Sequence, residues 1–387
     1  MRGRRSFLRD SLRLLAGGTA GSVSGRLAAA VTLTQPGTFA QPLLSSSCPD
    51  QKPETTLNDP AISGTVLANI QNAHVLSPAD SSLHIDDCRP PKRSEPQSVM
   101  QNTRLITVYG RSFGIAPILG MLGNFKSFNE LEQGIEPWVN STADLTGDRV
   151  TVAPHLIYAL ARPCHGSEDS CLIFLDALRG VDLIEDYIKP AAKRGMAVVL
   201  DAQLGRLSPI PILKRMINAG YLSFPNVHIA LDPEFSTKPG QSIPGTPWGT
   251  LSAELINEAQ GLLANYVRSA SLSHKKVLIV HQFVDATTNS WSMIPRKQHI
   301  KVFPEVELVF DADGFGSPDA KIYKYNAMTD PAVYPRMQWR GIKLFNQNPY
   351  ARYFSDNPLM TPQQVFGIEP TTSGRRMRIP PNLLVLS

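Results

Sequence analysis

Several common functional signatures are missing from this chain of 387 residues. Beyond the first 40 residues no stretch approaches ~18 consecutive apolar residues, so we expect no transmembrane helix. No G-x-G-x-x-G follows the first expected strand and there is no phosphate-binding loop, which argues against a dinucleotide or nucleotide site. We therefore expect no cofactor and no bound metal.

The chain also lacks an excess of basic residues outside its first 40 residues, although its net charge is +5. Residues 1–40 hold six arginines against Asp10 alone, and this segment accounts for the whole excess. The remaining 347 residues carry 32 basic and 32 acidic side chains. Arg375-Arg376-Met377-Arg378 is a basic run without interleaved aromatic residues, which is more typical of a solvated surface than of a nucleic-acid site. We expect no nucleic-acid partner.

The first 40 residues are typical of an export signal. The segment Gly3-Arg4-Arg5-Ser6-Phe7-Leu8 resembles the twin-arginine signal of bacteria. A Gly/Ala-rich, weakly apolar stretch follows, and Thr38-Phe39-Ala40 supplies small residues for cleavage. A basic amphipathic helix is the alternative. Cys48 follows three serines and not a lipobox, so we predict a periplasmic or extracellular protein without a lipid anchor.

The chain has four cysteines, which suits an oxidising compartment. Cys164 and Cys171 bracket a short polar segment, and we predict a local disulfide there. Free thiols, or a zinc site that uses Cys164, His165 and Cys171, are the alternatives, although the spacing does not match paired C-x-x-C knuckles. Cys48 and Cys88 are a possible second pair. We expect no cysteine nucleophile, because Cys164 and Cys171 are each other's expected partners, and no serine nucleophile, because we expect no nucleophile elbow.

Residues 41–100 hold eight prolines and nine serines with few aromatic residues, which indicates a linker or arm. From residue 101 onward, short apolar runs alternate with longer helical patterns, among them Leu172–Arg194, Ser208–Tyr221, Leu251–Ser269 and Pro318–Met328. Thr361-Pro362-Gln363-Gln364 predicts an N-cap followed by a short helix. We predict strands at Arg104–Tyr109, Val150–Ile157, Ala197–Ala202, Val227–Asp232, Val277–Gln282, Val306–Asp311, Gly341–Asn346 and Asn382–Leu386.

Most of these strands are continuously apolar, which is typical of parallel strands buried on both faces. Eight strands with seven crossovers match a (βα)₈ TIM barrel. The predicted fold class is therefore α/β, with one barrel domain over 101–387, behind a disordered leader (1–40) and linker (41–100). An open doubly wound sheet is the alternative.

Polar residues stand at the carboxyl ends of five successive predicted strands, where a barrel of this type places its site. Because a charged group there must be hydrated, paired or functional, we interpret them as one ring. Helix capping, or pairing with Arg206 and Lys343, is the structural alternative. The predicted substrate-binding residues are Tyr109, His155, Gln203, Arg206, His281, Gln282 and Lys343.

Carboxylates in this ring suit glycosidic cleavage, which needs one acid and one base or nucleophile. Asp232 and Glu234 lie two residues apart and share a face if the strand continues, as do Asp311 and Asp313. Glu234 is the best candidate acid/base because its side chain reaches furthest, with Asp201 or Asp313 opposite. His155 and His281 could instead join the carboxylates around a metal. No H-x-H or H-x-D pair stands at an expected strand end, which disfavours that alternative.

An ordered set of motifs also carries a resemblance to a known group of proteins. It comprises Val108-Tyr109-Gly110, Leu119-Gly120-Met121-Leu122-Gly123, Leu200–Arg206, Ala230–Phe235, Val280-His281-Gln282-Phe283, Asp313–Pro318 and Leu359-Met360-Thr361-Pro362. Over roughly 104–387 the chain resembles a largely uncharacterised family of secreted bacterial proteins, often lipoproteins, with a predicted TIM-barrel, glycoside-hydrolase-like domain. The resemblance implies an exported barrel, without a settled reaction.

Taken together, these observations predict an exported barrel protein that acts on carbohydrate or cell-envelope glycan, with a glycoside-hydrolase-like arrangement of carboxylates. A non-catalytic envelope or glycan-binding protein on the same scaffold is the second hypothesis, because this scaffold hosts many functions. A metal-dependent hydrolase is the third.

Overall fold

The structure is a computed structural model of the full chain. It describes residues 95–115, 120–164, 170–238, 240–241, 243–283, 292–332, 334–346 and 355–387. The described residues belong to one compact unit, which is the subject of this section. The predicted signal segment (1–40), Cys48 and Cys88 lie outside the described residues, as does His165.

The described chain folds into a closed parallel barrel. The strand order is β1-β9-β8-β7-β6-β5-β4-β2, and a parallel pairing between β1 and β2 closes the ring, while β3 adds to the end of β2. The prediction of a TIM-type α/β barrel is confirmed. The strands are β1 (Thr103–Gly110), β2 (Arg149–Ala161), β3 (Leu172–Phe174), β4 (Val198–Gly205), β5 (Val227–Ser236), β6 (Lys276–Gln282), β7 (Val306–Ala312), β8 (Trp339–Leu344) and β9 (Leu383–Leu386).

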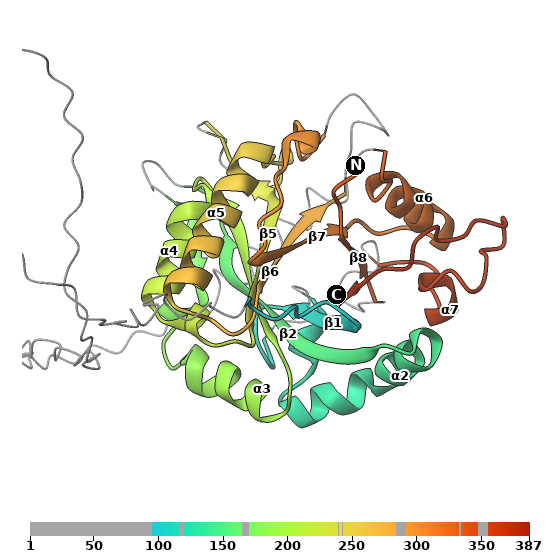
Figure 1. The fold of residues 1–387 in the computed structure, drawn as a ribbon, viewed down its shortest axis with the longest axis horizontal. Helices are drawn as coiled ribbons and strands as arrows, with labels where there is room; N and C mark the ends of the chain where they lie inside the picture. Colours follow the sequence, from blue (N-terminus) through green and yellow to red (C-terminus); the bar gives the residue numbers. More distant parts are fainter. Residues whose placement is uncertain are drawn as a thin grey trace, which may run out of the picture. The chain divides into compact units, whose positions relative to one another are not determined.

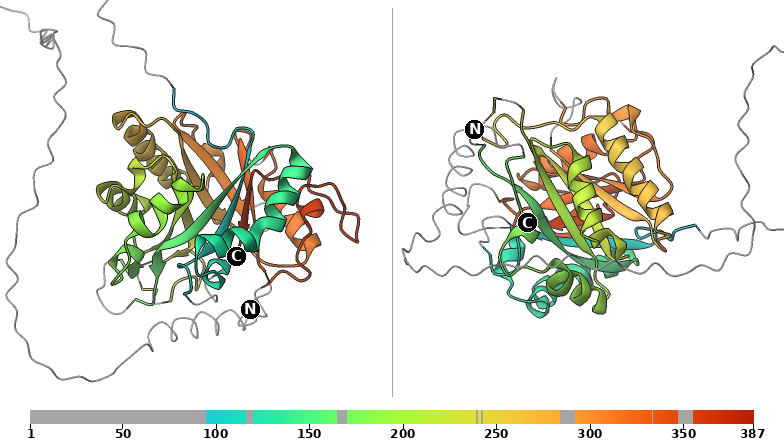
Figure 2. Two further views of the ribbon diagram at one scale, coloured as in Figure 1. Left: turned by 90° about the horizontal axis from the view of Figure 1, so that it is seen from below. Right: turned by 90° about the vertical axis from the view of Figure 1, so that its left-hand side faces the viewer.

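Helices lie on the outside of this ring of strands, as Figure 1 shows and the side views in Figure 2 repeat. Ser127, Ser252 and Ser317 cap three of them through their side chains. Short η segments complete several connections between strands. The α-helices are α2 (Phe128–Thr146), α3 (Lys189–Lys193), α4 (Pro209–Asn218), α5 (Ala253–Ser269), α6 (Pro318–Met328) and α7 (Pro362–Val365).

Each of the eight predicted barrel strands is present, with ends that shift by a few residues. The predicted helices over Ser208–Tyr221, Leu251–Ser269 and Pro318–Met328 correspond to α4, α5 and α6. Thr361 caps α7 as expected, and with Gln364 it forms a full capping box.

The helix predicted over Leu172–Arg194 is wrong in its first half. Leu172–Phe174 forms the short strand β3, which runs antiparallel to the end of β2. A 3₁₀ turn over Leu175–Ala177 follows, and helical structure begins only at Ile184, as a π-helical turn that continues into α3. The apolar residues of this segment pair with β2 instead of forming one face of a helix.

The predicted local disulfide is present between Cys164 and Cys171, with the two Cα atoms 5.2 Å apart. It joins the ends of the β2–β3 connection. Gly205, at the end of β4, lies directly against this hairpin and has a positive φ of 56°. A Cβ atom there would lie 2.4 Å from the carbonyl oxygen of Ser170, so the close approach requires glycine.

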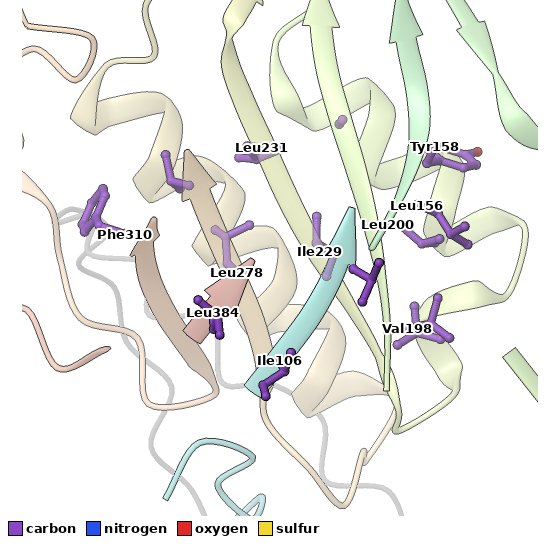
Figure 3. Packing of buried hydrophobic residues seen from close by; sticks show 14 of the residues in the cluster. Ile106, Leu156, Tyr158, Val198, Leu200, Ile229, Leu231, Leu278, Phe310 and Leu384 are labelled. Atoms are coloured by element: carbon purple, nitrogen blue, oxygen red, sulfur yellow. The ribbon is translucent and has the colours of Figure 1, made fainter. Parts of the chain in front are cut away.

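Apolar side chains fill the space between strands and helices. Figure 3 shows part of this outer core, with Leu200, Ile229, Leu231 and Leu278 on neighbouring strands. A second apolar cluster fills the amino-terminal half of the barrel interior and includes Leu105, Val277, Val309 and Val385. Because successive side chains alternate between the two faces of a strand, these clusters define which residues point inward.

The amino end of the barrel is closed by residues just before β1. Met100 is 1% exposed and belongs to the inner apolar cluster. Glu307 of β7 accepts hydrogen bonds from the backbone N–H groups of Val99 (2.8 Å) and Met100 (3.2 Å). Gln97 pairs with the segment that precedes β6. Contacts with the barrel therefore begin inside the segment predicted as a linker, at the end opposite the predicted site.

Among the described residues, no helix is long and apolar enough to cross a membrane.

Candidate functional site

Polar side chains fill the carboxyl-terminal half of the barrel interior, above the inner apolar cluster. We call this set the inner polar cluster. Each of its members is buried, with at most 6% of the residue exposed. Register brings several of them side by side, because Tyr109 pairs with His155 and His281 pairs with Asp311 across neighbouring strands. The inner polar cluster comprises Thr107, Tyr109, His155, Asp201, His281, Asp311, Asp313 and Lys343.

One half of the inner polar cluster is organised around His281. Its Nδ1 atom lies 3.0 Å from Oδ2 of Asp311 and 3.4 Å from Oδ2 of Asp313. Lys343 Nζ donates a hydrogen bond to Asp313 Oδ2 at 3.1 Å and lies 3.9 Å from the ring centroid of Tyr109. The predicted pairing of Lys343 with a ring carboxylate is thus present at Asp313.

The other half is organised around Asp201. Its Oδ2 atom lies 3.9 Å from Nε2 of His155 and 3.9 Å from Nε2 of His281. Thr107 Oγ1 lies 3.1 Å from Nδ1 of His155, on the opposite side of the imidazole ring. The Tyr109 ring makes an edge contact with the His155 ring, with centroids 5.1 Å apart. Three strands therefore aim two imidazoles and one carboxylate at a common point.

Asp232 and Glu234 extend the polar region along β5. The strand continues past Asp232 to Ser236, although its register with β4 shifts after Gln203. Oδ1 of Asp232 accepts a hydrogen bond from the backbone N–H of Glu234 at 3.1 Å. Asp232 is 2% exposed and Glu234 is 8% exposed. Asp232 therefore lies deeper and holds the backbone beneath Glu234.

The ion pairs set the protonation of the His281 half. Burial opposes the charged form of His281, but its contacts with Asp311 and Asp313 outweigh burial and raise its pKa well above the usual value. Burial likewise opposes ionisation of Asp313, yet Lys343 and His281 lower its pKa. The pKa of Lys343 is raised because nearby carboxylates, Asp313 first, outweigh burial. This half is a charged network.

Burial is the main influence on the pKa values around Asp201. It raises the pKa of Asp201 against the opposing charges of His281 and Lys343. It also raises the pKa of Asp232 well above its usual range, and the negative charges of Asp201 and Glu234 add to that effect. Burial, with the positive charges of His281 and Lys343, lowers the pKa of His155 well below its usual value. His155 is a neutral imidazole near pH 7.

Gln203 lies at this end of the barrel, Arg206 follows β4 in a loop, and Gln282 points away from the barrel interior. Gln203 Oε1 accepts a hydrogen bond from the backbone N–H of Ala161 at 2.9 Å. Arg206 is half-buried in the loop after β4, where it donates to the carbonyl of Gln241 at 3.5 Å. Gln282 follows the inward-facing His281, so it points outward and accepts a hydrogen bond from Lys297 Nζ at 2.7 Å.

Thr107 and Gly341 belong to the site but were not predicted. Thr107 sits two residues before Tyr109 on β1, and this spacing alone would have placed both on the inner face. Gly341 lies opposite Asp311 on β8, where a Cβ atom would lie 3.1 Å from Oδ1 of Asp311. An inward-facing glycine beside a predicted site is a signal of close packing.

One further pattern at this end is Gly110-Arg111-Ser112-Phe113-Gly114, which matches G-x-S-x-G. A nucleophile elbow needs a sharp turn from strand into helix. Ser112 follows β1, but it is buried, its hydroxyl donates to the carbonyl of Phe113 at 3.4 Å, and the described residues up to Ile115 form turns and bends. The local structure is not that of an esterase elbow.

Two groups of side chains within the inner polar cluster have metal-ligand spacing. In each group the potential ligand atoms lie within 4.8 Å of one another. The first is His155, Asp201 and His281, and the second is His281, Asp311 and Asp313. Imidazole nitrogens and carboxylate oxygens together suit divalent transition metals.

Comparison of the chain with protein-family models, with curated proteins and with solved structures finds no match. The function is therefore argued from the chemistry of the barrel interior.

Proposed function

We propose that this protein is an exported, glycoside-hydrolase-like enzyme that acts on carbohydrate or cell-envelope glycan. The observation that carries the proposal is the stacked pair of acids on β5, in which Asp232 holds the backbone N–H of Glu234 at 3.1 Å at the carboxyl end of a barrel strand. Active sites of such barrels form at this end. Glu234 is the acid/base in this proposal, and Asp232 is its positioning residue.

Glycosidic cleavage needs a proton donor at the leaving oxygen and a second carboxylate that acts as base or nucleophile. Burial, with smaller contributions from the charges of Asp201 and Glu234, raises the pKa of Asp232. A carboxyl group that stays protonated beside Glu234 supports the first requirement, because it keeps a proton at this end of β5. Asp201 and Asp313 on other strands are the candidates for the second carboxylate. Tyr109, Gln203 and Lys343 supply groups that can hydrogen-bond to sugar hydroxyls.

Export is the part of the proposal that rests on the first residues and on the cysteines. The Arg4-Arg5 motif resembles a twin-arginine signal. The Cys164–Cys171 disulfide supports it, because such bonds persist in oxidising compartments and are rare in the cytosol.

The test is a panel of polysaccharides and cell-envelope glycans, incubated with the full chain, with release of reducing ends as the readout. We expect Glu234→Gln to lower turnover by roughly 10²- to 10⁴-fold, the usual contribution of a general acid or base. Glu258→Gln, at an exposed position of α5, is the matched control and should keep full turnover. Unchanged turnover in Glu234→Gln would remove Glu234 from the chemistry.

The depth of burial favours a second candidate, a non-catalytic glycan-binding protein on the same barrel. With Asp232 2% exposed and Glu234 8% exposed, little of either carboxyl group is open to a leaving oxygen, which argues against direct acid catalysis. The same panel separates the two, because a binding protein retains a glycan without releasing reducing ends. Activity that is lost only after chelation would instead favour a metal-dependent hydrolase.

A further inference from the structure

We propose that His155, Asp201 and His281 bind one divalent transition-metal ion, of the Zn²⁺ class, inside the barrel. The three side chains come from β2, β4 and β6. Both imidazole Nε2 atoms lie 3.9 Å from Oδ2 of Asp201. Ligand atoms at this spacing close onto a metal with small side-chain adjustments. The proposal goes beyond the glycosidase proposal and does not rest on it. A metal at Asp201 would leave Asp313 as the candidate second carboxylate.

Unpartnered buried atoms are the first argument. Among the residues that the structure describes, Nε2 of His155, Nε2 of His281 and both carboxylate oxygens of Asp201 have no hydrogen-bond partner. The three side chains are at most 1% exposed. A buried polar group without a partner costs about 1–3 kcal/mol. Several such atoms that converge on one point indicate a ligand that satisfies them together.

The groups behind the two imidazoles are the second argument. Metal-ligating histidines usually engage their other ring nitrogen with a nearby oxygen, which fixes the tautomer and aims the free nitrogen at the metal. Here Thr107 Oγ1 lies 3.1 Å from Nδ1 of His155, and Asp311 Oδ2 lies 3.0 Å from Nδ1 of His281. His281 is protonated in the metal-free protein, so metal binding would release its Nε2 proton. With the remaining protons on Nδ1, both Nε2 lone pairs would face Asp201.

Charge is the third argument. The inner polar cluster holds the carboxyl groups of Asp201, Asp311 and Asp313. Its positive groups are Lys343 and the protonated His281, and His281 Nδ1 lies against Asp311 and Asp313. Buried charges need compensation by partners or by a bound ion. Lys343 is already committed to Asp313 at 3.1 Å. A divalent cation beside Asp201 would balance the charge of the half that Lys343 does not pair.

The alternative group, His281 with Asp311 and Asp313, is less suitable. Asp313 Oδ2 accepts a hydrogen bond from Lys343, and its Oδ1 accepts one from the backbone N–H of Gly314. An ion there would lie next to an ammonium group and would replace contacts that are already formed. Among the described residues, neither carboxylate oxygen of Asp201 accepts a hydrogen bond from an ammonium group or a backbone N–H.

The donor set indicates the class of ion. Two imidazoles and one carboxylate suit Zn²⁺, Fe²⁺, Co²⁺ or Ni²⁺, whereas Mg²⁺ and Ca²⁺ prefer sites built from oxygen. Three protein ligands leave a coordination position for water or a substrate oxygen, as in catalytic zinc sites. Because the ligands are buried, we expect the ion to enter while the chain folds.

The experiment measures the zinc content of the full chain, produced in zinc-supplemented medium and purified without chelator. We expect about one Zn²⁺ per chain, and a lower melting temperature after refolding in the presence of a chelator. Asp201→Asn keeps the side-chain shape and should reduce zinc to background. His299→Asn, at an exposed position, is the matched control and should keep the full content.

Thr107→Val tests the proposal without removing a ligand. It replaces a buried hydroxyl with a methyl group of the same shape, so the fold should persist by circular dichroism. Loss of a group that orients a ligating histidine typically weakens metal binding about 10- to 100-fold. We expect that range for Zn²⁺ added during refolding, and an unchanged affinity would count against the site even if Asp201→Asn failed to fold.

Three results would overturn the proposal. Zinc that survives Asp201→Asn would belong to another part of the chain. Zinc that is lost on Asp313→Asn but not on Asp201→Asn would belong to the alternative group. A folded chain that contains no zinc under any condition would make the inner polar cluster a metal-free polar core. Glycan turnover does not enter these measurements, so the failure of either proposal leaves the other testable.

Discussion

At the scale of single residues, Gly341 shows how tightly the inner polar cluster is packed. A Cβ atom at this position would lie 2.9 Å from Cδ2 of Leu383 and 3.1 Å from Oδ1 of Asp311. We expect Gly341→Ala to destabilise the fold by about 1–3 kcal/mol, the usual cost of inserting a methyl group into a packed interior. Chemical denaturation measures this as a lower midpoint at an unchanged slope.

Gly261 of α5 is the matched control. A Cβ atom there would lie 3.6 Å from Phe303, which is an ordinary contact. Gly261→Ala should be neutral or stabilise the protein by about 0.5–1 kcal/mol, because alanine favours a helix interior. Equal effects of the two substitutions would show that the space beside Asp311 is not as restricted as the structure indicates.

The positions of the acids and histidines at the strand ends could be predicted from the sequence, whereas the direction of each side chain could not. Asp201, His281 and Asp313 could be placed because a polar group directly after an apolar strand is conspicuous. Gln282 could not be separated from His281 in this way, although alternation along β6 sends its side chain to the outer face. Thr107 carries no such signal, because threonine is common in strands.

At the scale of elements, the turn before β1 closes the amino end of the barrel through Glu307. Its carboxylate accepts hydrogen bonds from the backbone N–H groups of Val99 and Met100. We expect Glu307→Ala to lower the free energy of unfolding by about 1–3 kcal/mol, because buried donors lose their acceptor. Hydrogen exchange at the amides of Val99 and Met100 should also become faster than in the unchanged protein.

Glu305, two residues earlier, provides the comparison. It pairs with Arg268 at 2.6 Å, and the Arg268 side chain is 51% exposed. An ion pair with an exposed partner contributes little, so Glu305→Ala should cost less than about 1 kcal/mol. A larger loss from Glu305→Ala than from Glu307→Ala would contradict the role assigned to the closing turn.

The strands could be predicted from the sequence because each is a short apolar run with a defined stop, and burial on both faces leaves few other structures for such a run. The segment Leu172–Arg194 could not, because its spacing of apolar residues is also compatible with a helix. The first residues of this segment, Leu172–Phe174, form a strand because they pair with the end of β2. The spacing of apolar residues within the segment does not reveal this pairing. The pairing of β1 with β9 could not be predicted from local sequence either, because these strands come from the beginning and the end of the barrel sequence.

At the scale of the whole molecule, one buried lysine links folding to pH. Lys276 is 0% exposed and donates hydrogen bonds to the carbonyls of Phe224 (2.7 Å) and Val227 (2.9 Å). Burial lowers its pKa from 10.5 to about 7. Between these values the unfolded chain binds a proton that the folded chain lacks, so stability rises with pH by up to about 1.4 kcal/mol per pH unit.

We therefore expect Lys276→Met to flatten the increase in unfolding free energy between pH 7 and pH 10, relative to the unchanged protein. The neighbouring His228 has a pKa well below 6.5 because of its burial and the charge of Lys276, so it does not titrate in this window. Lys275→Met, at the half-buried neighbouring position, should keep the original slope. Parallel curves for all three proteins would mean that Lys276 stays protonated in the folded state.

The closing turn at Val99 and Met100 also fixes the end of the barrel at which the preceding chain is attached. The described chain reaches the barrel at its amino end, where Gln97 and Glu307 fix its path, whereas the inner polar cluster lies in the carboxyl-terminal half. Any support joined to the protein through the residues before Glu95 would hold it by the closed end. Immobilised in that way on a bead, the barrel would present its carboxyl-terminal end to the solution.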